Sequence, residues 1–177
     1  EFIQLRKIFC HPFLIPRLKV EFITKYKEIN EHFTKEDRIN SLITASGKTI
    51  LLDKLLHKLK TQNRKVLIFS TLTKMLDIIE DIVIFKNYSY ERLDGNSKLS
   101  KQNSSINNFE TKDVFIFLLS LSSGAFGINI TKADTVIVYD NEWNLENNIQ
   151  VHAICRQISQ TQKLDVFRFI AGGSFES

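Results

Sequence analysis

Short apolar runs alternate with helix-period segments along most of this chain, and this alternation restricts the fold more than any other feature. The runs are rich in Val, Ile, Leu and Phe, as strands buried on both faces of a parallel sheet require. They occupy residues 66–69, 88–93, 114–119, 135–139 and 164–170. Amphipathic stripes predict helices around residues 50–59, 76–83, 106–109 and 145–158. The pattern predicts an α/β domain whose ligands bind at the carboxyl ends of its strands.

Length and composition place the chain among globular proteins. Its 177 residues are enough for one domain with a sizeable core. With 43% hydrophobic and 25% charged residues it has the composition of an ordered protein, and it has no apolar run of membrane-spanning length. The net charge of +4 favours a polyanionic partner only weakly. The two cysteines, Cys10 and Cys155, are too few for a disulfide framework and are interpreted as thiols.

The amino-terminal quarter differs in character from the rest. Residues 18–44 are charged and only patchily apolar, which favours a surface connector with some helix. We therefore expect a helical or irregular connector at 1–45 and the main domain at 46–177. The two ends of the chain look like interior segments, which suggests a piece of a longer protein.

One segment imitates a phosphate-binding loop. Residues 46–49 read SGKT and precede a predicted helix, as the end of a P-loop does. The first glycine of that motif is replaced here by Leu42, and no strand leads into the segment. Helix initiation, with Ser46 as the cap, explains it better. Any nucleotide is therefore expected to be contacted from elsewhere in the domain.

Several longer segments follow one another in a recognisable order. They are LRKIFCHPFL (5–14), SGKTILLDKLL (46–56), VLIFS with MLDI (66–70 and 75–78), LDG (93–95), FIFLLSLSSGAFGINI (115–130), and ADTVI with WN (133–137 and 143–144). This series resembles the C-terminal lobe of Swi–Snf-type chromatin-remodelling ATPases, over nearly the whole chain. Residues 41–43 and Ala153 lean toward the chromodomain-helicase-DNA-binding branch.

The resemblance implies a fold, partners and a cofactor. The fold is the second RecA-like lobe of a superfamily-two helicase, a P-loop-NTPase-type parallel sheet flanked by helices. The partners are double-stranded DNA or the nucleosome, and the N-terminal RecA-like lobe of the same protein. The cofactor is ATP, with Mg²⁺ bound mainly by that other lobe, and the location is the nucleus. An isolated second lobe is expected to be inactive.

Polar residues at strand-to-helix turns are the candidate DNA contacts. Hydroxyls, amides and helix N-termini at such turns suit phosphate oxygens, although ordinary capping explains each turn by itself. The candidates are Ser70, Thr71, Thr73, Asn96, Ser97, Ser120, Ser122 and Trp143. For Trp143 the resemblance implies the DNA-facing edge, and a buried anchor under the next helix is the alternative.

The candidate nucleotide contacts are Gly127, Asn129, Gln150 and Arg156. The last two lie in the segment that departs most from the family pattern. The resemblance implies Q-A-x-[DA]-R-x-H-R-x-G-Q, whose two arginines reach the γ-phosphate, whereas residues 150–160 read QVHAICRQISQ. Ile154 and Gln157 occupy the arginine positions, and neither can neutralise a developing anion. Arg156, in the histidine position, is the candidate substitute finger and the only catalytic candidate.

Further losses leave two functions open. Ser122 and Gln102 replace two more family arginines, which argues for weakened ATP turnover. The chain is then either one half of a DNA-dependent ATPase or a catalytically inactive DNA- or protein-binding scaffold of the same fold. A metal site is not expected, because the cysteine–histidine pairs at 10–11 and 152–155 lack partner ligands.

Overall fold

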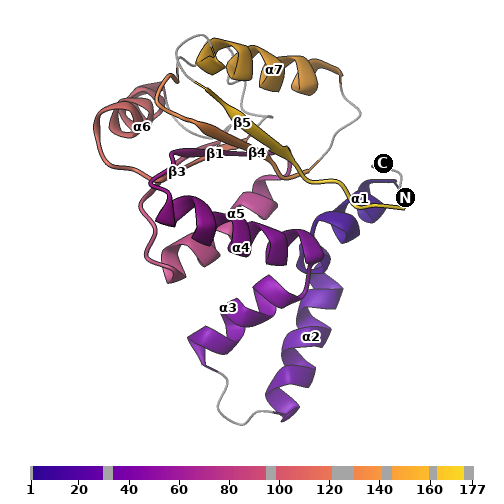
Figure 1. Ribbon diagram of the computed structural model, residues 1–177. Helices are drawn as coiled ribbons and strands as arrows, with labels where there is room; N and C mark the ends of the chain where they lie inside the picture. The colour runs from indigo at the N-terminus through magenta and orange to yellow at the C-terminus, as the bar shows by residue number, and fades with distance from the viewer. Residues whose placement is uncertain are drawn as a thin grey trace. The chain divides into compact units, whose positions relative to one another are not determined.

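In the computed structural model, residues 2–29, 34–94, 99–120, 130–140, 145–159 and 163–173 are described. The chain divides into two compact units, Glu1–Leu56 and His57–Ser177. Figure 1 shows the course of the chain and the labels of its elements. Each unit has its own internal contacts.

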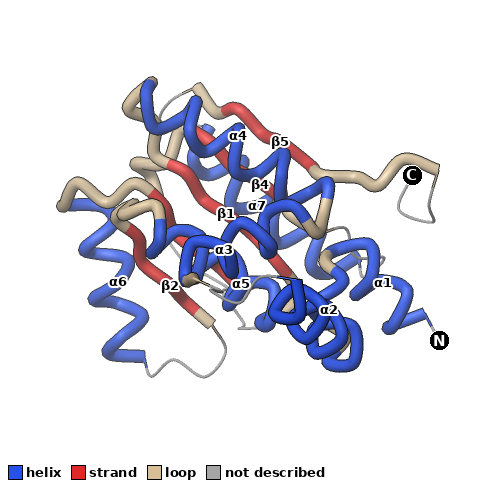
Figure 2. The backbone as a smooth tube through the Cα atoms, turned by 90° about the horizontal axis from the view of Figure 1, so that it is seen from below, coloured by secondary structure: helices blue, strands red, loops and turns tan. Residues whose placement is uncertain are grey.

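The second unit is built on a five-stranded parallel sheet. The strands are β1 (Val66–Ser70), β2 (Tyr90–Leu93), β3 (Ile116–Ser120), β4 (Thr135–Val138) and β5 (Asp165–Arg168). Their order is β2-β3-β1-β4-β5, and all neighbouring pairs are parallel. Figure 2 shows the strands lying side by side among the helices. Each strand falls within or next to one of the five apolar runs. The predicted α/β fold with a central parallel sheet is therefore confirmed.

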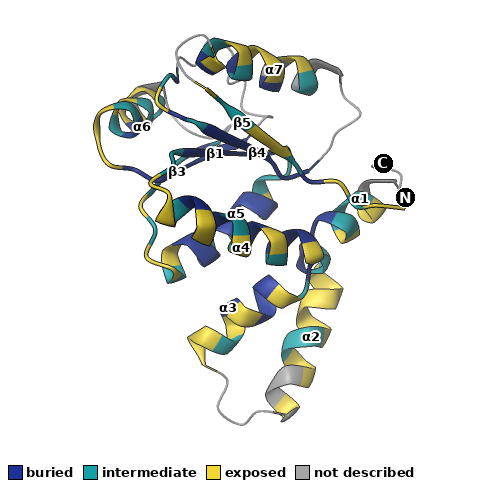
Figure 3. Ribbon diagram, in the orientation of Figure 1, coloured by how far each residue is buried: buried dark blue, intermediate teal, exposed yellow. Residues whose placement is uncertain are grey.

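Helices cover both faces of this sheet. Helix α5 (Thr73–Phe85) lies on one face, while α6 (Leu99–Thr111) and α7 (Leu145–Ser159) lie on the other (Figure 1). Strands β1, β3 and β4 are buried at every residue, which is why their sequences do not alternate with polar residues (Figure 3). The core beneath α6 and α7 includes Leu67, Phe69, Phe117, Val136, Val138, Phe109, Val151 and Ile158.

An arginine fastens the amino-terminal edge of the sheet. Arg64, just before β1, donates from Nε to Asp134 at 2.9 Å and from a terminal nitrogen to Asp165. These two aspartates lie at the starts of β4 and β5, so one guanidinium joins three neighbouring strands. Burial would lower the pKa of Arg64, but the hydrogen bond to Asp165 and the charge of Asp134 raise it. The cation is thus retained at any ordinary pH.

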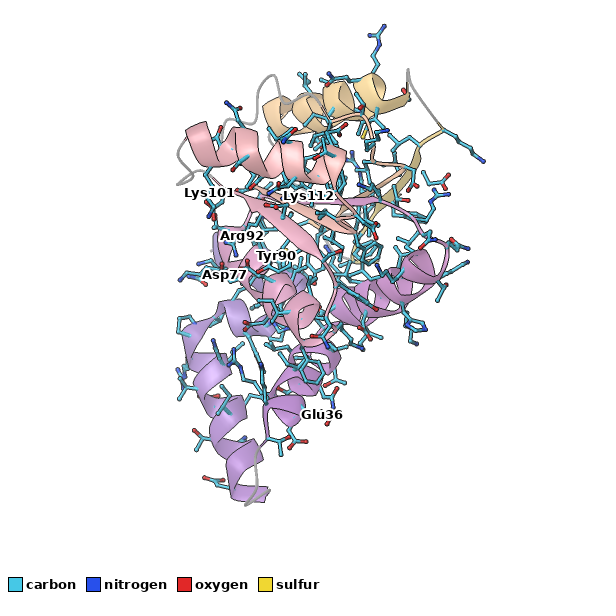
Figure 4. The ribbon with its side chains drawn as sticks, turned by 90° about the vertical axis from the view of Figure 1, so that its left-hand side faces the viewer. Glu36, Asp77, Tyr90, Arg92, Lys101 and Lys112 are labelled. Carbon is cyan, nitrogen blue, oxygen red and sulfur yellow. The ribbon has the colours of Figure 1, made fainter. Side chains whose placement is uncertain are left out.

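A second arginine, Arg92 on β2, gathers acidic groups. Its guanidinium donates to Asp77 at 2.7 Å and to Glu80 at 2.5 Å, and it lies 3.2 Å from Asp94. Figure 4 places Arg92, Asp77 and Tyr90 close together. Burial would lower the pKa of Arg92, but the hydrogen bond to Asp77 and the charge of Glu80 raise it. Because Asp77 and Glu80 belong to α5, the cluster fastens that helix to β2.

The first unit is helical. It contains α1 (Phe2–Cys10), a 3-10 turn η1 (Pro12–Leu14), α2 (Pro16–Ile29), α3 (Lys35–Thr44) and most of α4 (Gly47–Thr61). The region expected to be a connector with some helix is thus mostly helix, and α3 also buries Ile39, Leu42 and Ile43. Thr34 and Asp37 form a capping box that starts α3. None of the helices in the described ranges is long and apolar enough to cross a membrane.

His11 is a structural residue of this first unit. Its side chain is fully buried, with Nε2 2.8 Å from the Leu42 carbonyl oxygen, while Nδ1 accepts from the Phe13 amide at 3.1 Å. These two partners select the neutral ring with its proton on Nε2. Burial lowers the pKa of His11 against the opposing effect of the Leu42 hydrogen bond, and the charge of Lys19 lowers it further.

The Arg92 cluster predicts a stability difference between two arginines. Arg92→Met leaves three neighbouring carboxylates without their cation, and we expect a loss of about 2 kcal/mol in the free energy of unfolding. The control is Arg17→Met, because Arg17 pairs with a single carboxylate among the described residues, Glu21, and its side chain is 85% exposed. That change is expected to cost about 0.3 kcal/mol. Urea denaturation measures both, and equal losses would contradict the assignment.

His11 predicts a pH dependence of stability. Its pKa in the folded chain lies below the ordinary value of 6.5, so below pH 6.5 the unfolded chain binds a proton that the folded chain does not. The contribution of neutral His11 to the free energy of unfolding is fully present above pH 6.5, and it is lost as the pH falls from 6.5 toward the lowered pKa. Urea midpoints between pH 5 and 8 measure the slope, which His11→Asn should flatten. The matched control is His57→Asn, at an exposed position of α4, which should leave the slope unchanged.

Candidate functional site

The predicted DNA-binding turns leave the sheet at one edge. Ser70 at the end of β1 pairs directly with Ser120 at the end of β3, and Leu93 at the end of β2 pairs with Leu119. Because all strands are parallel, the chain leaves β1, β2 and β3 at the same carboxyl edge. This is the edge at which open α/β sheets bind their ligands.

The turn between β1 and α5 is held by internal hydrogen bonds. Ser70 is fully buried, and its hydroxyl oxygen accepts from the Leu72 amide at 3.1 Å. Thr71 donates its amide and its hydroxyl to Asp140, at 3.0 and 2.7 Å. Thr73 is the first residue of α5 and is half-buried, and Lys74 beside it is exposed. A cation and a helix N-terminus therefore face outward here, where a phosphate would find both favourable.

The other sequence candidates are distributed unevenly. Ser120 is fully buried at the end of β3. Six candidates lie outside the described residues, namely Asn96, Ser97, Ser122, Gly127, Asn129 and Trp143. Gln150 belongs to α7, but its side chain is not described. Of the predicted DNA contacts, the structure thus brings Ser70, Thr71, Thr73 and Ser120 together at the carboxyl edge.

Helix α7 carries the altered finger motif, and its faces separate the motif's residues. Ile154 is 5% exposed and packs in the core with Val151 and Ile158. Arg156 is exposed, because two residues along a helix is a rotation of about 200°. It lines a surface hollow of about 480 Å³ together with Gln157, Ile149, His152 and Ala153. Arg156 thus shares an exposed surface with the second family arginine position, and not with the first.

Two structural residues were missed by the analysis of the sequence. Asp140, which the sequence analysis did not assign to any site, holds the β1–α5 turn. Arg92 was not singled out, although it joins three carboxylates. Its signal was the spacing of Asp77 and Glu80 on one face of a helix, which places two acids side by side.

The structure describes the phosphate-loop-like segment and the cysteines that the sequence analysis set aside. The Ser46 hydroxyl donates to the Cys10 carbonyl at 3.0 Å, and Lys48 is buried, so the SGKT segment does not present an open phosphate cradle. Burial raises the pKa of the Cys155 thiol, against the opposing charge of Arg168. Within the described ranges, no group of three or more His, Cys, Asp and Glu side chains is arranged to hold a metal ion.

Comparison with known proteins connects this arrangement to a family. Residues 47–158 match the helicase conserved C-terminal domain. The chain is 38% identical over 175 residues to chromodomain-helicase-DNA-binding protein 8 of Danio rerio, and equally to chromodomain-helicase-DNA-binding protein 7 of Homo sapiens. These alignments cover 98% of this chain but only 7% and 6% of the relatives, so the chain spans a small part of their length.

A solved structure agrees with the sequence relatives. The crystal structure of the C-terminal part of the Fun30 ATPase domain superposes with a TM-score of 0.67 at 35% identity, over 74% of this chain and 43% of that one. The resemblance inferred from the ordered motifs is thereby confirmed, including its lean toward the chromodomain-helicase branch. The chain belongs to the helicase conserved C-terminal domain family, as a second RecA-like lobe of the Swi–Snf type.

Proposed function

We propose that this chain is the C-terminal motor lobe of an ATP-dependent DNA translocase that acts on chromatin in the nucleus. Its partners are double-stranded DNA or the nucleosome, and the N-terminal RecA-like lobe of the same protein. The relatives named for DNA binding and helicase activity support this role. Residues 46–177 would form the lobe, and residues 1–45 would connect it to the preceding part of the protein.

The observation that carries the proposal is the common edge of the sheet at which β1, β2 and β3 end. Ser70 and Ser120 are register partners there, and the exposed Lys74 stands in the first turn of α5. A DNA strand running along this edge would meet successive turns and the positive end of a helix. Ser70 and Ser120 are buried, so they would support the turns, while Thr73 and Lys74 would reach the phosphates.

The second part of the proposal concerns ATP. When bound, ATP supplies a γ-phosphoryl group whose transfer to water develops negative charge. The exposed Arg156 on α7 fits that charge, since its guanidinium lies on the open side of the helix beside Gln157. Ile154 does not fit it, because the side chain is apolar and turned into the core. We propose Arg156 as the substitute finger, with Gly127, Asn129 and Gln150 completing this lobe's share of the nucleotide contacts.

The burial of Ile154 also favours a second candidate function. Ile154 occupies the first arginine position and is buried, so this lobe has no cation there. A scaffold that binds DNA or protein without ATP turnover does not need one. The two functions differ in the preceding lobe. An intact phosphate-binding loop and D-E-x-H box there would support the motor, and their loss would support the scaffold.

Substitution of Arg156 tests the motor. In the full-length protein, Arg156→Ala should lower the DNA-stimulated kcat for ATP about a hundredfold or more, because an arginine finger carries a large part of the charge stabilisation. His152→Ala, on the same exposed face of α7, is the control and should leave kcat within about twofold. Unchanged hydrolysis in the Arg156 variant would exclude the substitute finger. Hydrolysis by residues 1–177 alone would contradict the role of a half-site.

Restoring the two family arginines one at a time tests the geometry of α7. Gln157→Arg places a cation in the same hollow as Arg156, so we expect a higher kcat with an unchanged unfolding midpoint. Ile154→Arg instead buries a charge against Val151 and Ile158, and should cost about 3 kcal/mol or more of stability. Steady-state ATPase and urea denaturation of both variants measure this contrast. A gain of activity from Ile154→Arg would show that our assignment of the buried face is wrong.

A further inference from the structure

Asp140 is a buried carboxylate at the carboxyl edge. It follows β4 and is only 1% exposed, yet it lies within hydrogen-bonding distance of a turn 69 residues earlier in the chain. One carboxylate oxygen accepts the Thr71 amide at 3.0 Å, and the other accepts the Thr71 hydroxyl at 2.7 Å. Hydrogen bonds to an ionised acceptor are the stronger kind, and a buried carboxylate requires them.

The donors of Thr71 are therefore not available to DNA. Phosphate oxygens only accept hydrogen bonds, and both donors of Thr71 already point to Asp140. The sequence-based expectation of a direct contact from Thr71 gives way to a different role for it. Thr71 connects the buried end of β1 to Thr73 and Lys74, the first residues of α5.

We propose that Asp140 is a positioning residue for the DNA-binding edge, acting through Thr71 on the first turn of α5. This inference rests on the proposed function, because it assumes that the edge binds a phosphate backbone. The pair joins β4 to the β1–α5 turn, so the turn that carries Thr73 and Lys74 is fixed to the neighbouring strand. Asp140 itself does not touch DNA.

The proposal and simple electrostatics predict opposite changes in DNA affinity when the charge of Asp140 is removed. Removing a negative charge near a phosphate-binding edge should strengthen DNA binding if charge alone matters. If Asp140 positions the turn, its removal weakens binding instead. In the full-length protein, Asp140→Ala and Asp140→Asn should each raise the Kd for a DNA duplex of about 40 base pairs by about tenfold. The slope of log Kd against log salt concentration should become smaller by about one.

Thr71 supplies a milder pair of variants if Asp140→Ala fails to fold. Thr71→Val keeps the shape and the amide but loses the hydroxyl, and should weaken binding about threefold, whereas Thr71→Ser should bind like the wild type. Adding Thr71→Val to Asp140→Ala should cost nothing more, because the Thr71 hydroxyl contributes only through its hydrogen bond to Asp140, which Asp140→Ala has already removed. A further loss in the double variant would show that Thr71 touches DNA directly, and would overturn the proposal.

Asp113→Asn is the matched control, since it also removes one negative charge but lies at the opposite, amino-terminal edge, before β3. It should leave the Kd unchanged or slightly lower. Fluorescence anisotropy at several salt concentrations measures every variant, with urea denaturation to verify folding. Unchanged or tighter binding by folded Asp140 variants would overturn the positioning role alone. A wild-type protein that does not bind the duplex would overturn the proposed function, and this inference with it.

Discussion

The parallel pairing of β1 with β3 on one side and β4 on the other is the constraint on which the rest of the structure depends. Ser70 and Ser120 are partners in the first pair, and Phe69 and Val138 are partners in the second. Because the central strands run the same way and are buried on both faces, every strand must end at one edge. That edge then collects polar turns from separate parts of the sequence, which is how a sheet with an apolar interior acquires a binding surface.

The two edges of the sheet use charge in different ways. At the amino-terminal edge, Arg64 neutralises Asp134 and Asp165, so opposite charges hold the starts of three strands together. At the carboxyl edge, Asp140 is held by the amide and hydroxyl of Thr71, which carry no charge of their own. These two hydrogen bonds fix the turn to the end of β4. The cation at this turn, Lys74, is left exposed on the first turn of α5.

Helix α7 combines a core-packing face with an open face, and the altered motif is divided between them. Ile154 adds apolar surface to the core at a position where the family pattern has a charged residue. An arginine there would have to reach past the packed face, whereas Arg156 and Gln157 already line the open one. The substitution therefore affects both packing and chemistry. For this physical reason, helix α7 is compatible with both candidate functions, the ATP-hydrolysing motor lobe and the inactive scaffold.

The sequence by itself determined the α/β class, the position of all five strands and the family, because buried parallel strands require continuous apolar runs and because the motifs follow in order. It placed Ser70, Thr71 and Ser120 at turns, which local pattern can do. It did not reveal that Asp140 holds Thr71, that Arg92 gathers Asp77, Glu80 and Asp94, or that Ile154 faces the core while Arg156 faces outward. Those facts depend on which distant segments the sheet order brings together, and on the rotation of a helix about its axis. Only the tertiary structure decides them, since no spacing along the chain encodes a contact across 69 residues.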